Sequence, residues 1–134
     1  MLTLSIVEPY RSALRNVRQA LMQHGLRVSV ELDIASNIKQ ELGARVAPCT
    51  VLLVDDPALL LEAIVFHRSA ALGIPQPVVV SGNGVQTEVF IHGLHSREER
   101  SLPATVVGPL TELQERLVRA LETIAEREPI LVHG

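Results

Sequence analysis

A continuous apolar run, Thr50–Val54, stands at the centre of the pattern of hydrophobic and polar positions along this chain. Because the run lacks polar alternation, we expect a strand that is covered on both faces. Asp56 and Pro57 then mark a helix start, since aspartate caps free N–H groups and proline fits the first helical position. The residues that follow predict a helix over about Pro57–Leu72, which ends at Gly73.

This predicted helix is apolar around almost its whole circumference. Its polar residues Glu62 and Ser69 fall on one narrow strip, so a single sheet cannot bury the remainder. Self-association is the commonest way to cover such a surface, and we therefore expect a homodimer that uses part of this helix or the sheet edge beside it. The alternative is that a C-terminal helix covers it within one chain. The apolar-side residues concerned are Leu59, Leu60, Ile64, Phe66, His67 and Ala71.

Strands and helices alternate before this centre. Leu2–Ile6 predicts a first strand, and Arg11–His24 predicts an amphipathic helix that ends at Gly25. Leu26–Ile34 shows the cleanest alternation of apolar and polar residues, so we expect a strand with one buried face and one face in water. A short helix is predicted over Ala35–Leu42.

The second half of the chain predicts a hairpin and a long helix. Two apolar segments, Val78–Val80 and Val85–His92, flank Asn83-Gly84, a dipeptide that tolerates the positive φ of a tight turn. Gly93–Gly108 begins with polar and charged residues and predicts a loop. Pro109–Glu128 predicts an amphipathic helix with one apolar face and Glu–Arg pairs four residues apart on the other.

These elements predict a single α+β domain over residues 1–134. Their order is β-α-β-(α)-β-α-β-β-α, and we expect a mainly antiparallel sheet of about five strands with helices packed on one face. The tight hairpin and the alternating strand disfavour a doubly wound parallel fold.

Composition narrows the classes of partner. Hydrophobic residues make up 47% of the chain, but there are only two Phe, one Tyr and no Trp, so the core must be aliphatic. The net charge of −3 and the few aromatic platforms disfavour nucleic acid and anionic membranes as partners. No apolar run approaches the ~20 residues of a membrane helix. The first apolar segment, Leu2–Val7, is short and has no basic leader, so we do not expect a signal peptide. We expect a cytoplasmic protein.

Short motifs in a fixed order also carry a family resemblance. They are Gly25-Leu26, Glu41-Leu42-Gly43, Pro48-Cys49, Asp56-Pro57, Glu62-Ala63, Gly73-Ile74-Pro75, Val78-Val79-Val80 and Asn83-Gly84. Over about Leu4–Ile91 this succession resembles the domain of unknown function 302 family. The resemblance implies a small bacterial or archaeal α+β domain, often dimeric, with no established activity or cofactor. The family frequently has asparagine where this chain has Asp56, which keeps the capping role.

Cys49 is the only cysteine, which excludes an internal disulfide and a multi-cysteine metal cluster. It lies where a loop becomes the central strand. A thiol there could accept sulfur or take part in redox chemistry if a nearby cation or helix N-terminus lowered its pKa. A buried cysteine can also act simply as a small hydrophobic residue. The sequence supplies no activating neighbour, so the second interpretation is favoured.

Other polar residues are candidates for ligand or metal binding. Asp33 and Asp55 lie at strand ends, where pockets form, and His67 lies within the apolar helix. His92 and His95, with Glu88 upstream, could hold a divalent metal, but their spacing is not that of a helical site and no third close ligand is evident. We therefore expect no bound metal and no cofactor.

Arginines form one stripe of the first predicted helix, at Arg11, Arg15 and Arg18. They could bind an anion, although a solvated helix face is the simpler interpretation. The leading hypothesis is a self-associating domain without enzymatic activity that can bind a small molecule. The alternative is a thiol-dependent sulfur-transfer or redox protein that uses Cys49.

Overall fold

The computed structural model describes residues 1–93 and 103–128, and within them the strands form one antiparallel sheet. The sheet order is β2-β3-β4-β5-β1-β6. The strands are β1 (Leu2–Ile6), β2 (Arg27–Asp33), β3 (Cys49–Asp55), β4 (Gln76–Gly82), β5 (Thr87–Ile91) and β6 (Glu126–Arg127). The helices are α1 (Tyr10–Gln23), α2 (Ile34–Leu42), α3 (Pro57–Phe66) and α4 (Ala104–Glu122), with a 3-10 helix η1 (Arg68–Leu72).

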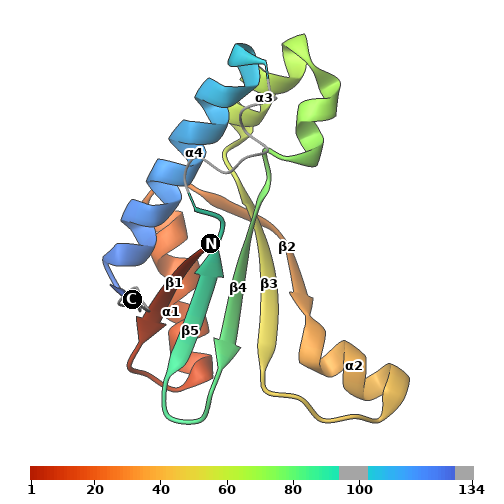
Figure 1. Cartoon of the computed structure of the whole chain (residues 1–134), viewed down its shortest axis with the longest axis vertical. Coiled ribbons are helices and arrows are strands. Elements are labelled where there is room, and N and C mark those ends of the chain that lie inside the picture. The colour runs from red at the N-terminus through yellow and green to blue at the C-terminus, as the bar shows by residue number, and fades with distance from the viewer. Residues whose placement is uncertain (94–102, 129–134) are drawn as a thin grey trace, which may run out of the picture.

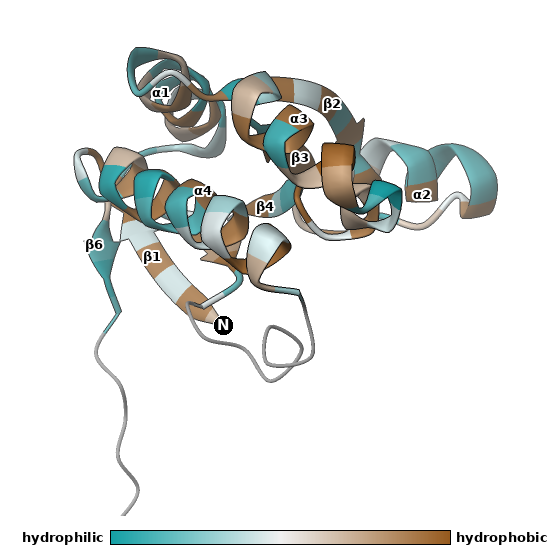
Figure 2. Ribbon diagram, turned by 90° about the horizontal axis from the view of Figure 1, so that it is seen from above, coloured by the Kyte–Doolittle hydropathy of each residue, from teal (hydrophilic) through white to brown (hydrophobic). Residues whose placement is uncertain are grey.

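Helices α1 and α4 lie on one face of the sheet (Figures 1 and 2). Helix α3 and η1 lie beyond the ends of β3 and β4 and beside α4, whereas α2 projects from the opposite end (Figure 1). The predicted α+β class with helices on one face is therefore confirmed, and the short β6 adds a sixth strand. Alternate strand residues point into the aliphatic core between the layers. The core includes Leu4, Leu52, Val54, Val78, Val80 and Val89 from the sheet, and Val17, Leu21, Leu113, Leu117 and Leu121 from the helices.

A β-bulge at Ser29 changes the face to which the side chains of β2 point. Val28 pairs with Val54 and Val30 pairs with Leu53, which leaves Ser29 as the extra residue. Residues directly opposite each other on antiparallel strands share a face. Val28 therefore lies on the helix-covered face, but Val30 lies on the other one.

The predicted division of this strand into one buried and one wet face is therefore wrong beyond Ser29. Leu32 pairs with Val51 on the face that no helix covers, and it is 43% exposed. Glu31 and Asp33 pair with Leu52 and Thr50, and these partners are buried on the helix-covered side. The alternation in sequence is intact, but the bulge moves the apolar residues to the face without helices and the acidic ones to the helix-covered side, where both remain exposed.

Within the single chain, the prediction that β3 is covered on both faces is also wrong. Its buried residues alternate with half-buried ones, because the described helices pack on one side only. On the other side a row of paired residues crosses five strands: Leu32, Val51, Val79, Phe90 and Thr3. A second row holds Val30, Leu53 and Pro77. We call these two rows the open sheet face.

The segment predicted as one helix over Pro57–Leu72 is divided in two. His67 has an extended backbone, with φ −142° and ψ 101°, so the α-helix ends at Phe66 and a 3-10 turn follows. The break directs the chain so that Ala70 and Ile74 reach the core. His67 is exposed, not on a buried helix face as predicted.

The C-terminal helix begins five residues earlier than predicted, at Ala104, and ends at Glu122. The predicted loop over Gly93–Gly108 is wrong for residues 104–108, and residues 94–102 lie outside the described part. Pro109 lies inside the helix, where it removes one backbone hydrogen bond. It is itself buried, as is Val106, and burial of apolar surface offsets that loss. Among the described residues no helix is both long and apolar enough to cross a membrane.

Asp56 joins α3 to α4. Its carboxylate caps α3 by accepting from the Ala58 N–H, and its other oxygen pairs with the Arg116 guanidinium of α4. Burial alone would raise the pKa of Asp56, but hydrogen bonds from Arg116 and from the Ala58 and Leu59 amides outweigh it and hold the pKa below its ordinary value. The ionised form is therefore the one that the fold stabilises.

This linkage predicts a specific acid sensitivity. A carboxylate with a lowered pKa adds stability above the ~3.9 of an unfolded aspartate, and that stability is lost as the pH falls through the folded-state pKa. Asp56→Asn keeps a capping side chain but removes the charge. We expect the wild type to be more stable than this variant at pH 7, with the difference disappearing in acid. Urea unfolding at several pH values measures the free energy of unfolding of both proteins. A difference between them that does not change with pH would contradict the linkage.

Candidate functional site

A cleft opens beside Tyr10, between the first turn of α1 and the segment that joins β2 to β3. One part has a volume of about 460 Å³ and is lined by Tyr10, Asp33, Ala35, Ser36, Lys39, Arg45, Val46 and Pro48. An adjoining part of about 680 Å³ runs along α1 and is lined by Tyr10, Arg11, Leu14, Arg15, Arg18, Glu31, Asp33 and Thr50. The two parts share Tyr10 and Asp33, and we call them together the Tyr10 cleft. Their volumes are in the range of small-molecule sites.

Tyr10 is held in place by the sheet beneath it. Its hydroxyl forms a hydrogen bond with the Thr50 hydroxyl at the start of β3. A Cβ added at Gly82 would lie 3.3 Å from the Tyr10 Cβ and 3.8 Å from the Pro48 Cβ. Only glycine therefore leaves full room for Tyr10 at this point of β4. Burial and the nearby Asp33 carboxylate raise the pKa of Tyr10, so its hydroxyl is neutral at pH 7.

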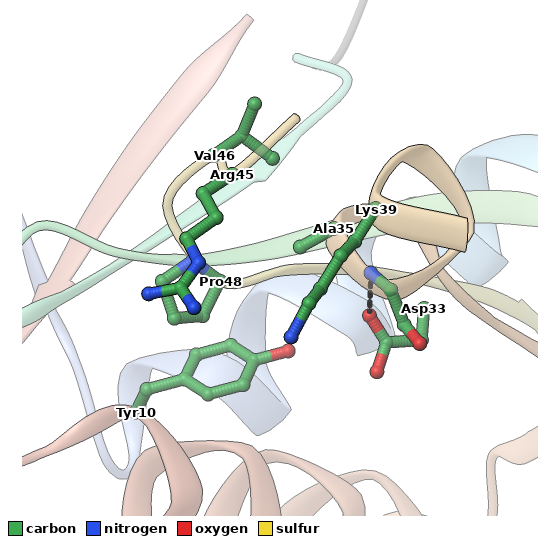
Figure 3. Close-up of a pocket in the computed structure, with 8 residues that line it drawn as sticks. Tyr10, Asp33, Ala35, Lys39, Arg45, Val46 and Pro48 are labelled. Atoms are coloured by element: carbon green, nitrogen blue, oxygen red, sulfur yellow. Dashed lines mark hydrogen bonds between the residues drawn. The ribbon is translucent and has the colours of Figure 1, made fainter. Parts of the chain in front are cut away.

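The two acidic residues of the cleft already have partners. Asp33 caps α2 by accepting from the Ser36 N–H at 2.9 Å, as the dashed line in Figure 3 shows. Glu31 forms a two-point ion pair with Arg18 of α1, with one contact of 3.0 Å. Both acidic residues reach this side only because the bulge at Ser29 turns them toward α1.

Four of the cationic side chains in the cleft have no such partner. No ion pair to Arg11, Arg15, Lys39 or Arg45 occurs within residues 1–93 and 103–128. In Figure 3 the side chains of Lys39 and Arg45 extend from α2 and the segment that follows it toward Tyr10, which lies on α1 across the cleft. The cleft is therefore positively charged, although the whole chain carries a net charge of −3.

Cys49 directly precedes Thr50 and is half-buried. By strand alternation it belongs to the side of Val51 and Leu53, not to the Tyr10 side. Burial, together with the negative charge of Asp33, raises the pKa of the Cys49 thiol. A raised pKa lowers the thiolate fraction, so this environment favours the structural interpretation over the reactive one.

The structure separates the other predicted ligand-binding residues. Asp33 is in the cleft, but Asp55 lies at the opposite end of the β2–β3 ladder, where it pairs with Arg27 at 2.9 Å. Asp55 is 2% exposed, so that carboxylate is part of a partly buried ion pair. His67 ends α3 and is exposed. These three residues do not line one described pocket.

Of the two predicted metal-binding histidines, His92 lies within the described residues. His92 is exposed beside β5 and lines a shallow apolar hollow of about 210 Å³ with Met1, Pro77, Val79, Phe90 and Ile91. His95 lies outside the described residues. In the part of the chain that the structure describes, no three His, Cys, Asp or Glu side chains are placed to hold a metal ion.

Sequence reasoning identified the α1 arginines and Asp33 but missed Tyr10, Lys39 and Arg45. A usable signal was present, because Tyr10 is the only tyrosine and Lys39 the only lysine in the chain. Neither residue forms a local motif. Tyr10 meets Thr50 across 40 positions, and only the fold brings them together.

Comparison with known proteins identifies the fold but no activity. A family model described as a domain of unknown function, DUF302, matches residues 2–124. The match extends past the 4–91 region of the sequence motifs and includes all of α4. The crystal structure of an uncharacterized conserved DUF302 protein from Bacillus stearothermophilus is similar, with a TM-score of 0.79 and 15% identity. The similarity covers 91% of this chain and 95% of that one. No curated protein matches this sequence.

The position of Tyr10 can be tested by titration, since no other tyrosine or tryptophan contributes to the absorbance. We expect the phenol of the native protein to ionise at a higher pH than that of the unfolded protein, which has a pKa of ~10. A raised pKa gives stability below that value, and this stability is lost as the pH rises through the folded-state pKa. Asp33→Asn should reduce the shift, because it removes a charge that raises the pKa. Equal native and unfolded midpoints would contradict the packed position.

Cys49 gives a second test. At neutral pH we expect a thiol reagent to label the native protein more slowly than free cysteine, because burial and Asp33 raise the thiol pKa. Asp33→Asn should speed the labelling, whereas Asp55→Asn, at the other end of β3, should not. Rapid labelling of the native wild type would instead support the thiol-dependent alternative.

Proposed function

The chain belongs to the family of the domain of unknown function DUF302, whose description assigns no activity, and we propose that it is a self-associating domain that binds a small molecule in the Tyr10 cleft. The observation that carries the ligand-binding part is the cleft itself. Its floor is fixed by Tyr10, Thr50 and Gly82, and polar side chains from several elements converge on it. A largely pre-formed hollow with a few converging polar groups is typical of ligand sites.

Binding is favoured over catalysis by the state of the candidate reactive groups. Asp33 caps α2, Asp55 pairs with Arg27, and Asp56 both caps α3 and pairs with Arg116. The thiol of Cys49 has a raised pKa. The contacts of the three aspartates and the raised thiol pKa of Cys49 oppose the use of these groups as a base or nucleophile.

The open sheet face supports self-association. A solvated antiparallel face normally carries polar residues at alternate positions. Here the centre of the face is Val51, Leu53, Val79 and Phe90, and none of the described helices lies on it. The next row on the same side is polar and contains Cys49, Ser81, Glu88, Ser5 and Glu126, so two carboxylates lie at the corner near β6. The two apolar rows of the open sheet face can pack against their own copy, with the carboxylates of the polar row at the rim of the contact.

Helix α2 gives an independent argument for a second chain. It has nine residues, and none of them is buried. Ile34, Ile38 and Leu42 are spaced four apart and form an apolar stripe, and Leu42 is 78% exposed. Isolated helices of this length are marginal in water, so packing of the stripe against a partner would stabilise the helix.

A second apolar surface provides a competing interface. Leu61, Val65, Phe66 and Leu72 are exposed on α3 and η1. Helix α4 covers the other side of α3, where Leu59 and Ala63 are buried, and Leu60 and Ile64 are partly buried. The alternative of coverage by the C-terminal helix therefore applies to part of α3. The open sheet face is the broader of the two surfaces, since it spans five strands.

Sedimentation equilibrium at micromolar concentration tests the dimer. We expect the wild type to be dimeric and Leu32→Glu to be a folded monomer, because Leu32 is already partly exposed in the single chain. Val85→Glu is the matched control, since Val85 is an exposed valine in the β4–β5 turn region. It should leave the dimer intact.

Circular dichroism shows whether each variant is folded. Loss of the dimer in Phe66→Glu, with Leu32→Glu still dimeric, would move the interface to α3 and η1. A monomeric wild type would overturn self-association.

A further inference from the structure

The charge of the Tyr10 cleft suggests what kind of molecule it holds. The cleft presents five cationic side chains, Arg11, Arg15, Arg18, Lys39 and Arg45, and two anionic ones, Glu31 and Asp33. Five of the twelve basic residues of a net-negative chain thus lie around one cleft. Such a local reversal of charge attracts anions from solution, especially where low-dielectric walls focus the field.

The ion pairs and hydrogen bonds within the cleft leave several cationic side chains available to bind an anion. Arg18 is matched by Glu31, and the Asp33 carboxylate faces the N–H of Ser36. Arg11 and Arg15 on α1 then stand on one side, and Lys39 and Arg45 on the other. Among the described residues these four have no ion-pair partner.

We propose, building on ligand binding in the Tyr10 cleft, that the ligand is a small organic polyanion whose phosphate or carboxylate groups are held by Arg11 and Arg15 on one side and by Lys39 and Arg45 on the other. Arginine binds such groups through two parallel N–H donors, and lysine adds a point charge. The Tyr10 ring and Pro48 between the two sides provide a surface for the less polar part of the molecule.

The geometry favours a small ligand over a nucleic acid strand. A strand would need charge along an extended groove and successive aromatic platforms for its bases. Here the four cations that have no ion-pair partner among the described residues of the lining surround one cleft of limited volume, and Tyr10 is the only aromatic residue in that lining. A compact molecule with two or more negative groups fits both observations.

The test is a titration of the full-length, ¹⁵N-labelled protein, followed by NMR. Pyrophosphate and citrate serve as phosphate and carboxylate probes, and sodium chloride of matched ionic strength is the reference. We expect saturable shifts in amides of Tyr10–Arg18, Asp33–Lys39 and residues 45–50, and the tighter of the two probes identifies the anionic group. No saturable shift in these segments with either probe overturns the proposal.

Variants separate a specific site from general attraction. Lys39→Gln combined with Arg45→Gln should weaken binding roughly tenfold or more, and Arg11→Gln combined with Arg15→Gln should do the same. All four residues are exposed, so we expect the variants to fold. Arg119→Gln is the matched control, an exposed arginine on α4 far from the cleft lining, and should change the affinity by less than about twofold. Equal weakening by the control would overturn the proposal.

A set of neutral aromatic fragments distinguishes the proposal from the function on which it rests. If these fragments shift the NMR signals of the cleft amides and neither anion does, the cleft binds ligands, but the proposal that the ligand is anionic is wrong. If neither the fragments nor the anions bind, both the anionic class and ligand binding in the cleft are overturned. The oligomeric state measured separately is unaffected by either result.

Discussion

The single extra residue in β2 is the constraint on which the rest of the site depends. Because side chains alternate with a period of two, one inserted residue exchanges the faces of everything that follows it. Beyond Ser29 the acidic residues Glu31 and Asp33 therefore face α1, and Val30 and Leu32 face away from the helices. The first effect builds one wall of the Tyr10 cleft, and the second extends the open sheet face to the sheet edge.

The cleft shows how a charged surface is kept compatible with a small aliphatic domain. The charges of Glu31 and Asp33 are each balanced locally, by Arg18 and by the N-terminus of α2. Unpaired charges are instead placed on exposed side chains, where water screens them and their cost in folding is small. Positive potential thus collects at one place without burying an unpaired ion. Among the described residues, the buried carboxylate is Asp55, which lies elsewhere and has Arg27 as its partner.

The apolar residues on the two faces of the sheet are covered in different ways. On one face α1 and α4 cover the strands, and α3 extends the same aliphatic core beyond the strand ends. On the other face the pairing places Leu32, Val51, Val79 and Phe90 in one row with no described helix above them. Removing the apolar residues of such a row from water lowers the free energy of the state in which they are buried. The proposed dimer supplies that burial, and the stripe on α2 is a further surface that a partner could cover.

The sequence by itself determined the order of the elements and the α+β class, because apolar periodicity, Asp56-Pro57 and Asn83-Gly84 are local signals that act through the nearest backbone. It also identified the family, and it indicated the α1 arginines and Asp33 as possible ligand contacts. It could not determine the face of β2, since a bulge depends on pairing with β3. The end of α3 at Phe66 was likewise set by how Ala70 and Ile74 reach the core. Only the tertiary structure brought Tyr10, Lys39 and Arg45 together, because they meet through contacts between residues far apart in the chain, which no local pattern encodes.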